Sequence, residues 1–219
     1  LLVQAIPRKT GYTAKMLSHF KEGLAKTDSV VKEIDLLNCH IKPCMGCYRC
    51  WSTTPGRCVI RDDMDQLLEQ FLESDIIFLA TPMYHYNMNC EMLKFFERTL
   101  PFSEYGFNNS PLGLMRNSIR YPERWKNKKL GLLTCGAFKE EENFSAIMRT
   151  FNLIANGMNL GTCGILIRPE SYLLRFKPAK PKTITIIEKA FERAGYELGT
   201  KGYIEKETME KAKTPIVST

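Results

Sequence analysis

The sequence predicts an α/β fold, a doubly wound parallel sheet of five strands in the order 2-1-3-4-5 with helices on both faces. Segments with strand and helix patterns alternate along the chain. The segment 75–80, Asp-Ile-Ile-Phe-Leu-Ala, is continuously apolar after its first residue, as in a central strand buried on both faces. The chain has 219 residues, of which 44% are hydrophobic, so we expect a single domain over residues 1–219.

The first part of the chain predicts two strands and two helices. Residues 1–5 end a first strand, and residues 14–26 follow as a helix with Thr13 as its N-cap. Residues 29–36 predict a second strand, and a cysteine-rich loop follows its carboxyl end, which places the cysteines on the same edge of the sheet as the loops after the other strands. Asp62 then opens a second helix, where its charge complements the helix dipole. The apolar face of that helix consists of Met64, Leu67, Leu68, Phe71 and Leu72.

The second part continues the alternation around one interruption. The strand at 75–80 leads into a loop at 81–89, and a helix follows with apolar residues at Met92, Leu93, Phe95 and Phe96. Residues 101–126 are rich in Pro, Gly and Asn and predict an irregular insertion, which is a lid, a subunit contact or a solvated excursion. The remaining predicted elements are a strand at 129–134, a helix at 143–157, a strand at 160–167, a helix at 183–199 and a short helix in the tail 205–219.

Half of the eight cysteines lie in one loop, 43–60, at Cys44, Cys47, Cys50 and Cys58. The spacing Cys-x2-Cys-x2-Cys lets three sulfurs surround one centre from a single turn, and a Pro-Gly bend brings the fourth. Sulfur ligands in this number bind Zn²⁺ or an iron–sulfur cluster. The triple spacing favours iron–sulfur, although such runs often take their fourth ligand from elsewhere, which leaves Cys58 with the weakest support. A set of free, reduced thiols is the other alternative.

The remaining composition favours a reduced, cytoplasmic protein. A mid-sized chain with alternating strands and helices is unlike a small disulfide scaffold, so we expect reduced thiols. Outside the loop, Cys39, Cys90, Cys135 and Cys163 have the alternative of being small buried residues, as unpaired cysteines often are. The sequence shows no secretory signal and no apolar run of the roughly 18 residues that a membrane helix needs, so we expect no membrane partner. The formal charge of +7 is spread along the chain, so we expect no nucleic-acid partner.

Three loops follow the predicted first, third and fourth strands, where a doubly wound sheet binds its ligand. The first loop contains Arg8, Lys9, Thr10 and Thr13 before a helix start. Cations, hydroxyls and helix N–H groups together can hold a phosphate. An ordinary capped turn with two solvated cations is the alternative.

The second and third loops add flat apolar surface. Thr81-Pro-Met-Tyr-His-Tyr-Asn-Met88 combines a Thr-Pro bend with aromatic and amide side chains, which suits a planar heteroaromatic ligand. Tyr84 and His85 are the candidate proton donors there, although a lone loop histidine often only faces solvent. In the third loop, Gly136 allows close backbone approach and Phe138 allows stacking, while Cys135 is either part of the pocket or a buried small residue.

These stretches resemble known proteins. Ala5-Ile-Pro-Arg-Lys-Thr-Gly-Tyr-Thr13 is similar to the Ser-Pro-Arg-Lys-x-Gly-x-Thr phosphate loop of the flavodoxin-like NAD(P)H-dependent FMN reductases. Thr81-Pro-Met-Tyr84 through Lys94 and Arg98 resembles their flavin loop and following helix. The motif from Cys44 to Cys58, continuing to Asp62-Asp63-Met64, resembles the iron–sulfur flavoprotein branch of that superfamily.

The resemblance implies a flavodoxin-like fold, bound FMN and a [4Fe–4S] cluster on the four cysteines of loop 43–60. It also implies NAD(P)H or a ferredoxin-like protein as electron donor, a small molecule or protein as acceptor, and a homodimer or homotetramer with the cluster near a subunit contact. The residues implied to bind FMN are Arg8, Lys9, Thr10, Thr13, Pro82, Met83, Tyr84, Asn87, Met88, Cys135 and Gly136. Two positions depart from the pattern, because Ile6 replaces a phosphate-binding Ser and Tyr12 replaces a common Asn.

Two other functions remain open from the sequence. One is a cluster-free NAD(P)H-dependent FMN or quinone reductase, in which the cysteines are spectators or a redox switch. The other is a zinc-stabilised module whose positive charge binds nucleic acid. The content of flavin, iron and zinc distinguishes the three.

Overall fold

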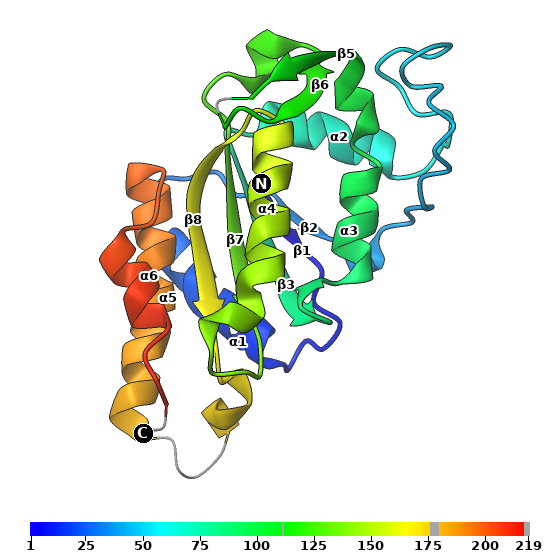
Figure 1. Cartoon of the computed structure of the whole chain (residues 1–219). Helices are drawn as coiled ribbons and strands as arrows, with labels where there is room; N and C mark the ends of the chain where they lie inside the picture. Colours follow the sequence, from blue (N-terminus) through cyan, green and yellow to red (C-terminus); the bar gives the residue numbers. More distant parts are fainter. Residues whose placement is uncertain (111, 176–179, 217–219) are drawn as a thin grey trace.

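The computed structural model describes residues 1–110, 112–175 and 180–216, and it contains a central parallel sheet (Figure 1). The end of the predicted tail, residues 217–219, lies outside the described residues. The strand order is β2-β1-β3-β7-β8, and every neighbouring pair is parallel. The five strands are β1 Leu2–Gln4, β2 Glu33–Asp35, β3 Ile76–Tyr84, β7 Lys129–Cys135 and β8 Gly161–Arg168. The predicted order 2-1-3-4-5 is therefore confirmed, with β7 and β8 as the fourth and fifth strands.

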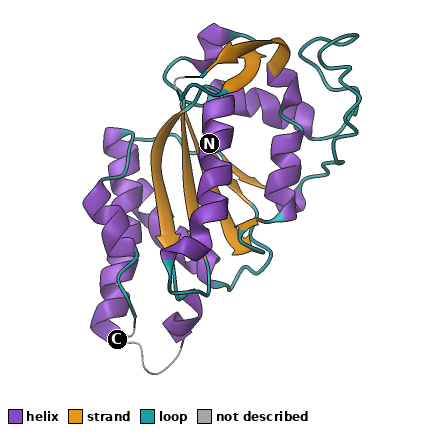
Figure 2. Ribbon diagram, in the orientation of Figure 1, coloured by secondary structure: helices purple, strands orange, loops and turns teal. Residues whose placement is uncertain are grey.

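Helices cover both faces of the sheet (Figure 2). Each face has its own apolar core. One face packs against α1 Tyr12–Leu24, α5 Pro181–Lys201 and α6 Lys206–Ala212. The other face packs against α2 Met64–Glu73, α3 Cys90–Glu97 and α4 Ser145–Gly157. Along β3, Ile77 and Leu79 enter one core, whereas Phe78 and Ala80 enter the other. The continuous apolar run arises because both faces of this strand are buried.

Two glycines let α1 and α5 cross closely. A Cβ on Gly23 would lie 1.7 Å from the carbonyl oxygen of Glu192, and one on Gly195 would lie 1.9 Å from that of Phe20. Because backbone atoms cannot move aside as a side chain can, only glycine permits this approach. The long helix α5 is thereby fixed against α1 on one face of the sheet.

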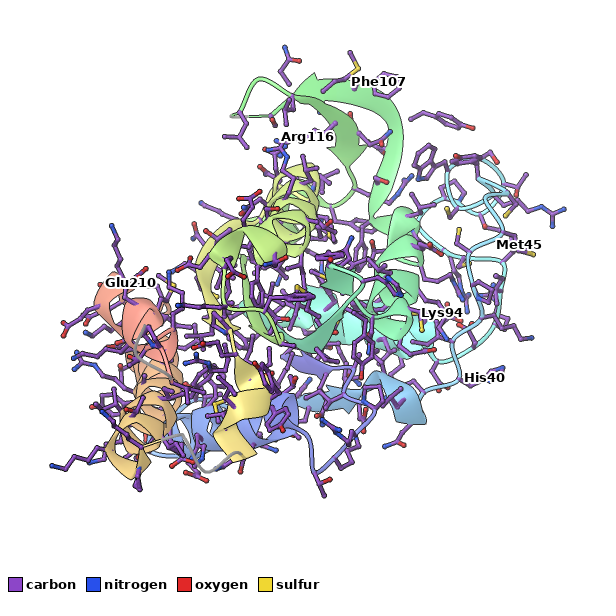
Figure 3. The ribbon with its side chains drawn as sticks, turned by 60° about the horizontal axis from the view of Figure 1, so that its bottom comes forward. His40, Met45, Lys94, Phe107, Arg116 and Glu210 are labelled. Atoms are coloured by element: carbon purple, nitrogen blue, oxygen red, sulfur yellow. The ribbon has the colours of Figure 1, made fainter. Side chains whose placement is uncertain are left out.

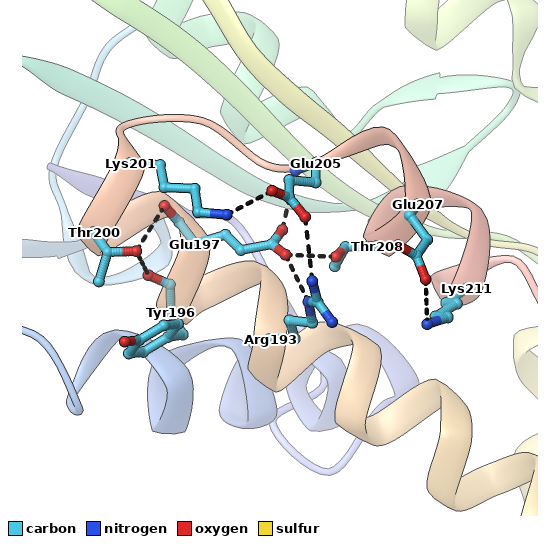
Figure 4. Close-up of polar contacts among 9 residues, drawn as sticks. All are labelled: Arg193, Tyr196, Glu197, Thr200, Lys201, Glu205, Glu207, Thr208 and Lys211. Atoms are coloured by element: carbon cyan, nitrogen blue, oxygen red, sulfur yellow. Dashed lines mark hydrogen bonds and ion pairs between the residues drawn. The ribbon is translucent and has the colours of Figure 1, made fainter.

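A buried carboxylate joins α5 to α6 (Figure 4). Glu197 is 2% exposed and accepts hydrogen bonds from Arg193 Nε at 2.7 Å and from the Thr208 hydroxyl at 2.8 Å. Its other oxygen accepts the Glu205 N–H at 3.0 Å, just before α6 begins. The charge is satisfied by three donors, so the short helix predicted in the tail is held in place by α5.

The insertion predicted to be irregular contains an antiparallel ribbon, so that expectation was wrong. β5 Ser103–Asn109 pairs with β6 Met115–Ile119, and the register shifts between Glu104 and Phe107. At its base, Phe102 and Trp125 are buried against Phe71, with Trp125 5.8 Å from the Phe71 ring centroid. Most of β5 is exposed on both sides, which removes the alternation that normally reveals a strand.

The third strand also extends further than predicted. The segment 81–89 is not a simple loop, because β3 continues to Tyr84 and pairs with the short strand β4 Asn87–Met88. His85 and Tyr86 form the turn, with φ of 45° and 65°, as in a type I′ hairpin. β2 is shorter than predicted, since Leu36–Asn38 forms a 3-10 turn capped by Asp35. No helix in the described parts of the chain combines the length and apolar composition that spanning a membrane requires.

Candidate functional site

A pocket of about 230 Å³ lies at the carboxyl ends of β1, β3 and β7. Seven of the residues predicted to bind FMN line it, namely Arg8, Thr13, Pro82, Met83, Tyr84, Cys135 and Gly136. They come from three separate loops, which meet because parallel strands end at the same edge of the sheet. The lining also includes Ile6, Pro7, Gly11, Tyr12, Ala137, Ser171 and Tyr172.

The N-terminus of α1 forms one end of this pocket. Gly11 is the extended N-cap, no side chain caps the helix, and the first turn contains no acidic residue. Thr13 is therefore not the N-cap as predicted; it lies inside the first turn and is buried. The first N–H groups of a helix have no partner within the helix, and the helix dipole attracts anions there. Together with the exposed cation Arg8, this end of the pocket fits a phosphate group.

The two departures from the family pattern have structural consequences. Ile6 is 2% exposed and lines the pocket with an apolar side chain, whereas the family pattern has the hydroxyl of a Ser at this position. Tyr12 donates its hydroxyl to the carbonyl oxygen of Tyr172 at 3.1 Å, and the Arg8 guanidinium lies 5.6 Å from its ring centroid. Tyr12 thus joins the phosphate end of the pocket to the loop after β8.

That loop after β8 was not predicted to reach the pocket. It folds back onto the end of β7, where Gly136 N–H donates to the Arg168 carbonyl and Gly136 carbonyl accepts from Ser171 N–H, both at 3.0 Å. These backbone bonds bring Ser171 and Tyr172 to the lining. Because these are backbone bonds, no pattern in the sequence indicates that Ser171 and Tyr172 reach the pocket.

Cys135 and Gly136 are packed tightly at the end of β7. Burial raises the pKa of Cys135 to about 12, so its thiol stays protonated despite its contact with Thr13. A Cβ on Gly136 would lie 2.7 Å from both Met83 and Phe144. Gly136 is therefore needed for packing beneath the pocket, and its N–H is already bonded. Cys163 is buried like Cys135, whereas Cys90 is exposed, so it is not a small buried residue.

Five predicted site residues do not line the pocket. Lys9 pairs with Asp35 at the end of β2, and Thr10 is exposed in the first loop. His85 is exposed in the β3–β4 turn. Asn87 donates to the Thr150 hydroxyl of α4 at 3.1 Å, and Met88 is 2% exposed in the core. Asn87 and Met88 anchor the hairpin to α4 and the core.

The four cysteines of the loop line a second, small pocket of about 20 Å³. Cys50 is buried, Cys44 and Cys58 are partly buried, and Cys47 is exposed. Burial raises the pKa of the Cys50 thiol, and the charges of Cys58, Cys44 and Cys47 raise it further. The four cysteines therefore surround the same small space.

This second pocket lies at the C-terminal end of α3. Its lining includes Glu97, Arg98, Leu100 and Pro101, and Trp51 in the loop donates to the Leu100 carbonyl at 2.9 Å. The sequence predicted the cysteines on the same edge of the sheet as the other three loops, which was wrong. The loop leaves that edge after β2 and then follows the outside of α3 to its far end (Figure 1).

The donor set of the loop is all sulfur, which suits either an iron–sulfur cluster or a Zn²⁺ ion. Zn²⁺ holds four ligands at about 2.0–2.3 Å from one centre. In the described residues, no three Cys, His, Asp or Glu side chains are arranged so that they could hold a metal ion. Four cysteines and the carboxylate of Glu97 line the pocket, and four sulfur ligands are found in iron–sulfur sites as well as in structural zinc sites.

Part of the chain is similar in sequence to curated iron–sulfur flavoproteins. The iron–sulfur flavoprotein of Archaeoglobus fulgidus is 38% identical over 96 residues, 44% of this chain and 43% of that protein. The iron–sulfur flavoprotein of Methanosarcina thermophila is 26% identical over 98 residues, 45% of this chain and 50% of that protein. The chain therefore spans about half the length of the curated relatives it matches.

Solved structures share the fold. An FMN-dependent NADH-azoreductase from Bacillus anthracis superposes with a TM-score of 0.67 at 12% identity, covering 91% of this chain and 98% of that one. An NAD(P)H:quinone oxidoreductase from Methanothermobacter marburgensis gives a TM-score of 0.64 at 16% identity, covering 90% and 96%. The sequence model for NADPH-dependent FMN reductase matches residues 1–147, two-thirds of the chain. The protein belongs to the NADPH-dependent FMN reductase family, and the curated proteins similar to it include iron–sulfur flavoproteins.

Proposed function

We propose that the protein is an FMN-dependent oxidoreductase with a [4Fe–4S] cluster, which passes electrons between a reduced donor and a small acceptor through FMN. The observation that supports this most directly is that one short helix, α3, begins beside the first loop and ends at the cysteine pocket. Its N-cap, Asn89, donates to the Ala5 carbonyl at 2.6 Å, next to the first loop, and Arg98 at its other end lines the cysteine pocket. Two redox sites joined by one rigid element are expected of an electron-transfer flavoprotein.

The first pocket offers each part of FMN a suitable environment. The N-terminus of α1 and Arg8 would bind the phosphate, while Pro82, Met83 and Tyr84 would contact the ring system from the end of β3. When bound, FMN supplies both hydride and single-electron chemistry. Tyr84 is the proposed source of a hydrogen bond near the reacting ring, because it lines the pocket whereas His85 does not.

The second pocket would hold the cluster through Cys44, Cys47, Cys50 and Cys58. α3 has eight residues and is about 12 Å long. The protein residues between the sites keep the two redox centres at a fixed separation, because Asn89 and Arg98 attach both ends of the helix to their surroundings. Electron carriers of the NAD(P)H or ferredoxin type are the proposed donors.

A homodimer or homotetramer is also proposed, with the cysteine loop near the subunit contact. Large apolar side chains are exposed on the loop and on the β5–β6 ribbon, and Met45 and Phe107 extend outward from these segments (Figure 3). Trp51 in the loop packs edge-on against Tyr105 of the ribbon, with centroids 5.3 Å apart, so the two segments form a continuous surface. The exposed residues are Met45, Tyr48, Tyr105, Phe107 and Met115. Exposed apolar surface of this kind commonly marks a protein interface.

One preparation tests the proposal. The protein is purified without oxygen, its absorption spectrum is recorded, and its flavin, iron, sulfide and zinc contents are measured. The proposal predicts FMN together with iron and sulfide. Flavin without iron would instead support a cluster-free FMN or quinone reductase, and zinc without flavin or iron would contradict both oxidoreductase functions.

A further inference from the structure

Arg98 is a buried cation that borders the cysteine pocket. It lies at the end of α3, is 1% exposed, and forms an ion pair with Asp62, whose side chain is fully buried. The Nη1 and Nη2 atoms donate to the two carboxylate oxygens at 2.6 and 3.0 Å, and Nη1 also donates to the Lys42 carbonyl at 2.7 Å. This is the two-point geometry that arginine forms and lysine cannot.

Asp62 is satisfied without needing any further partner. Besides the two guanidinium nitrogens, it accepts the N–H groups of Lys42 at 2.9 Å and Met64 at 3.1 Å. These contacts fix the carboxylate between the start of the cysteine loop and the start of α2. The guanidinium is therefore fixed in place as well, next to the sulfur ligands.

Arg98 still has capacity to interact with the sulfur atoms. Its Nε–H is buried and has no hydrogen-bond partner among the described residues. Because a guanidinium stays protonated, Arg98 brings a permanent positive charge to the lining of the cysteine pocket.

The pocket needs such a charge if it holds four thiolates. Among the described residues that line it, Arg98 is the one cation and Glu97 the one anion. Reduction of an iron–sulfur cluster adds negative charge, and its potential depends on nearby charge and on hydrogen bonds to the sulfurs. A buried cation acts more strongly than an exposed one, because water screens it less.

We propose that Arg98 is the charge-compensating residue of the cysteine pocket, where it stabilises the reduced cluster on the four cysteines. This role rests on the proposed cluster. Asp62 is then a positioning residue, which orients the guanidinium without contacting the sulfurs.

The test compares three variants of the protein purified without oxygen. Arg98→Gln removes the buried charge, and Arg98→Lys retains the charge without the two-point geometry. Arg57→Gln is the matched control. It also removes a cation, directly before Cys58, but the Arg57 side chain is 65% exposed. Iron content, FMN content and the midpoint potential of the cluster, followed by electron paramagnetic resonance, are measured for each.

We expect Arg98→Gln to make cluster reduction about tenfold less favourable, a shift of about 59 mV to more negative potential. We expect it also to retain less iron, while FMN content is unchanged because the flavin pocket lies at the other end of α3. Arg98→Lys is expected to keep most of the wild-type potential, and Arg57→Gln to match the wild type.

Wild-type potential and full iron content in Arg98→Gln, or an equal shift in Arg57→Gln, would overturn the role of Arg98 alone. A wild-type protein without iron would overturn the proposed cluster and this role with it. If Arg98→Gln fails to fold, the double variant Asp62→Asn, Arg98→Gln avoids the unpaired carboxylate. It is expected to show a smaller shift in the same direction, and no shift would overturn the proposal.

Discussion

Replacing Asp62 with asparagine would leave Arg98 as an unpaired cation inside the protein. Both side chains are at most 1% exposed, and they share hydrogen bonds of 2.6 and 3.0 Å. A hydrogen bond to a charged group contributes about 1.5–3 kcal/mol. Breaking a buried ion pair by removing one partner costs about 3–5 kcal/mol. We therefore expect Asp62→Asn to lower the free energy of unfolding by about 3–5 kcal/mol at pH 7.

The pH dependence of this effect follows from the pKa of Asp62. Burial on its own would raise that pKa, but the bonds from Arg98 and from the N–H groups of Lys42 and Met64 outweigh it and lower the pKa below 3.8. A carboxyl group whose pKa is lowered on folding stabilises the protein above its unfolded pKa, and this stabilisation is lost as the pH falls through the folded value. The difference in unfolding free energy between wild type and Asp62→Asn should therefore be largest near pH 7 and should decrease below about pH 4.

Urea unfolding of the metal-free protein, followed by circular dichroism, measures this difference independently of any cluster. Asp65→Asn is the control, because the Asp65 side chain is 36% exposed and pairs with Arg61 at 3.2 Å on the surface. We expect that control to lose less than about 1 kcal/mol. Equal unfolding free energies for Asp62→Asn and Asp65→Asn at pH 7 would refute the reasoning.

Three further predictions concern the two pockets and the helix packing. Cys47→Ser should abolish the iron content while FMN remains bound, as measured by metal analysis and flavin absorption. Arg8→Gln should weaken FMN binding about tenfold or more in a fluorescence titration, because a charge-assisted hydrogen bond to phosphate is lost. Gly195→Ala should lower the free energy of unfolding by about 1–3 kcal/mol or more, since its methyl group would overlap the Phe20 carbonyl oxygen.

Each of these changes has a control in the same chain. Cys90 is exposed outside the loop, so Cys90→Ser should retain all iron. Lys9 is paired with Asp35, so Lys9→Gln should alter FMN affinity much less than Arg8→Gln. A Cβ on Gly157 would meet no atom within 4 Å, so Gly157→Ala should not destabilise the protein. Iron loss in Cys90→Ser, or equal FMN affinities for the two cation variants, would contradict the assigned sites.

The main sheet could be predicted from the sequence because its signals are local. The apolar run of β3 and the apolar faces of α2 and α5 are visible in the local pattern of apolar residues, and the alternation of strands and helices predicts a parallel, doubly wound sheet. The loops with Arg8 and Tyr84 meet at one pocket for the same topological reason.

The remainder depends on contacts between distant residues. The β5–β6 ribbon lacks alternation because most of β5 is exposed on both sides. Tyr172 reaches the flavin pocket through backbone bonds between the loop after β8 and Gly136, which leave no sequence pattern. The cysteine loop reaches the far end of α3 because Trp51 and Asp62 bind Leu100 and Arg98, and neither contact could be foreseen from spacing.

An anaerobic reductive titration tests the central claim, that one protein combines a flavin with an iron–sulfur cluster. Dithionite is added in known amounts while visible absorption reports the flavin and electron paramagnetic resonance reports the iron. The account predicts uptake of about three electrons per chain, two by FMN and one by the cluster, with an iron signal that develops during the titration. Uptake of only two electrons, without any iron signal, would contradict it.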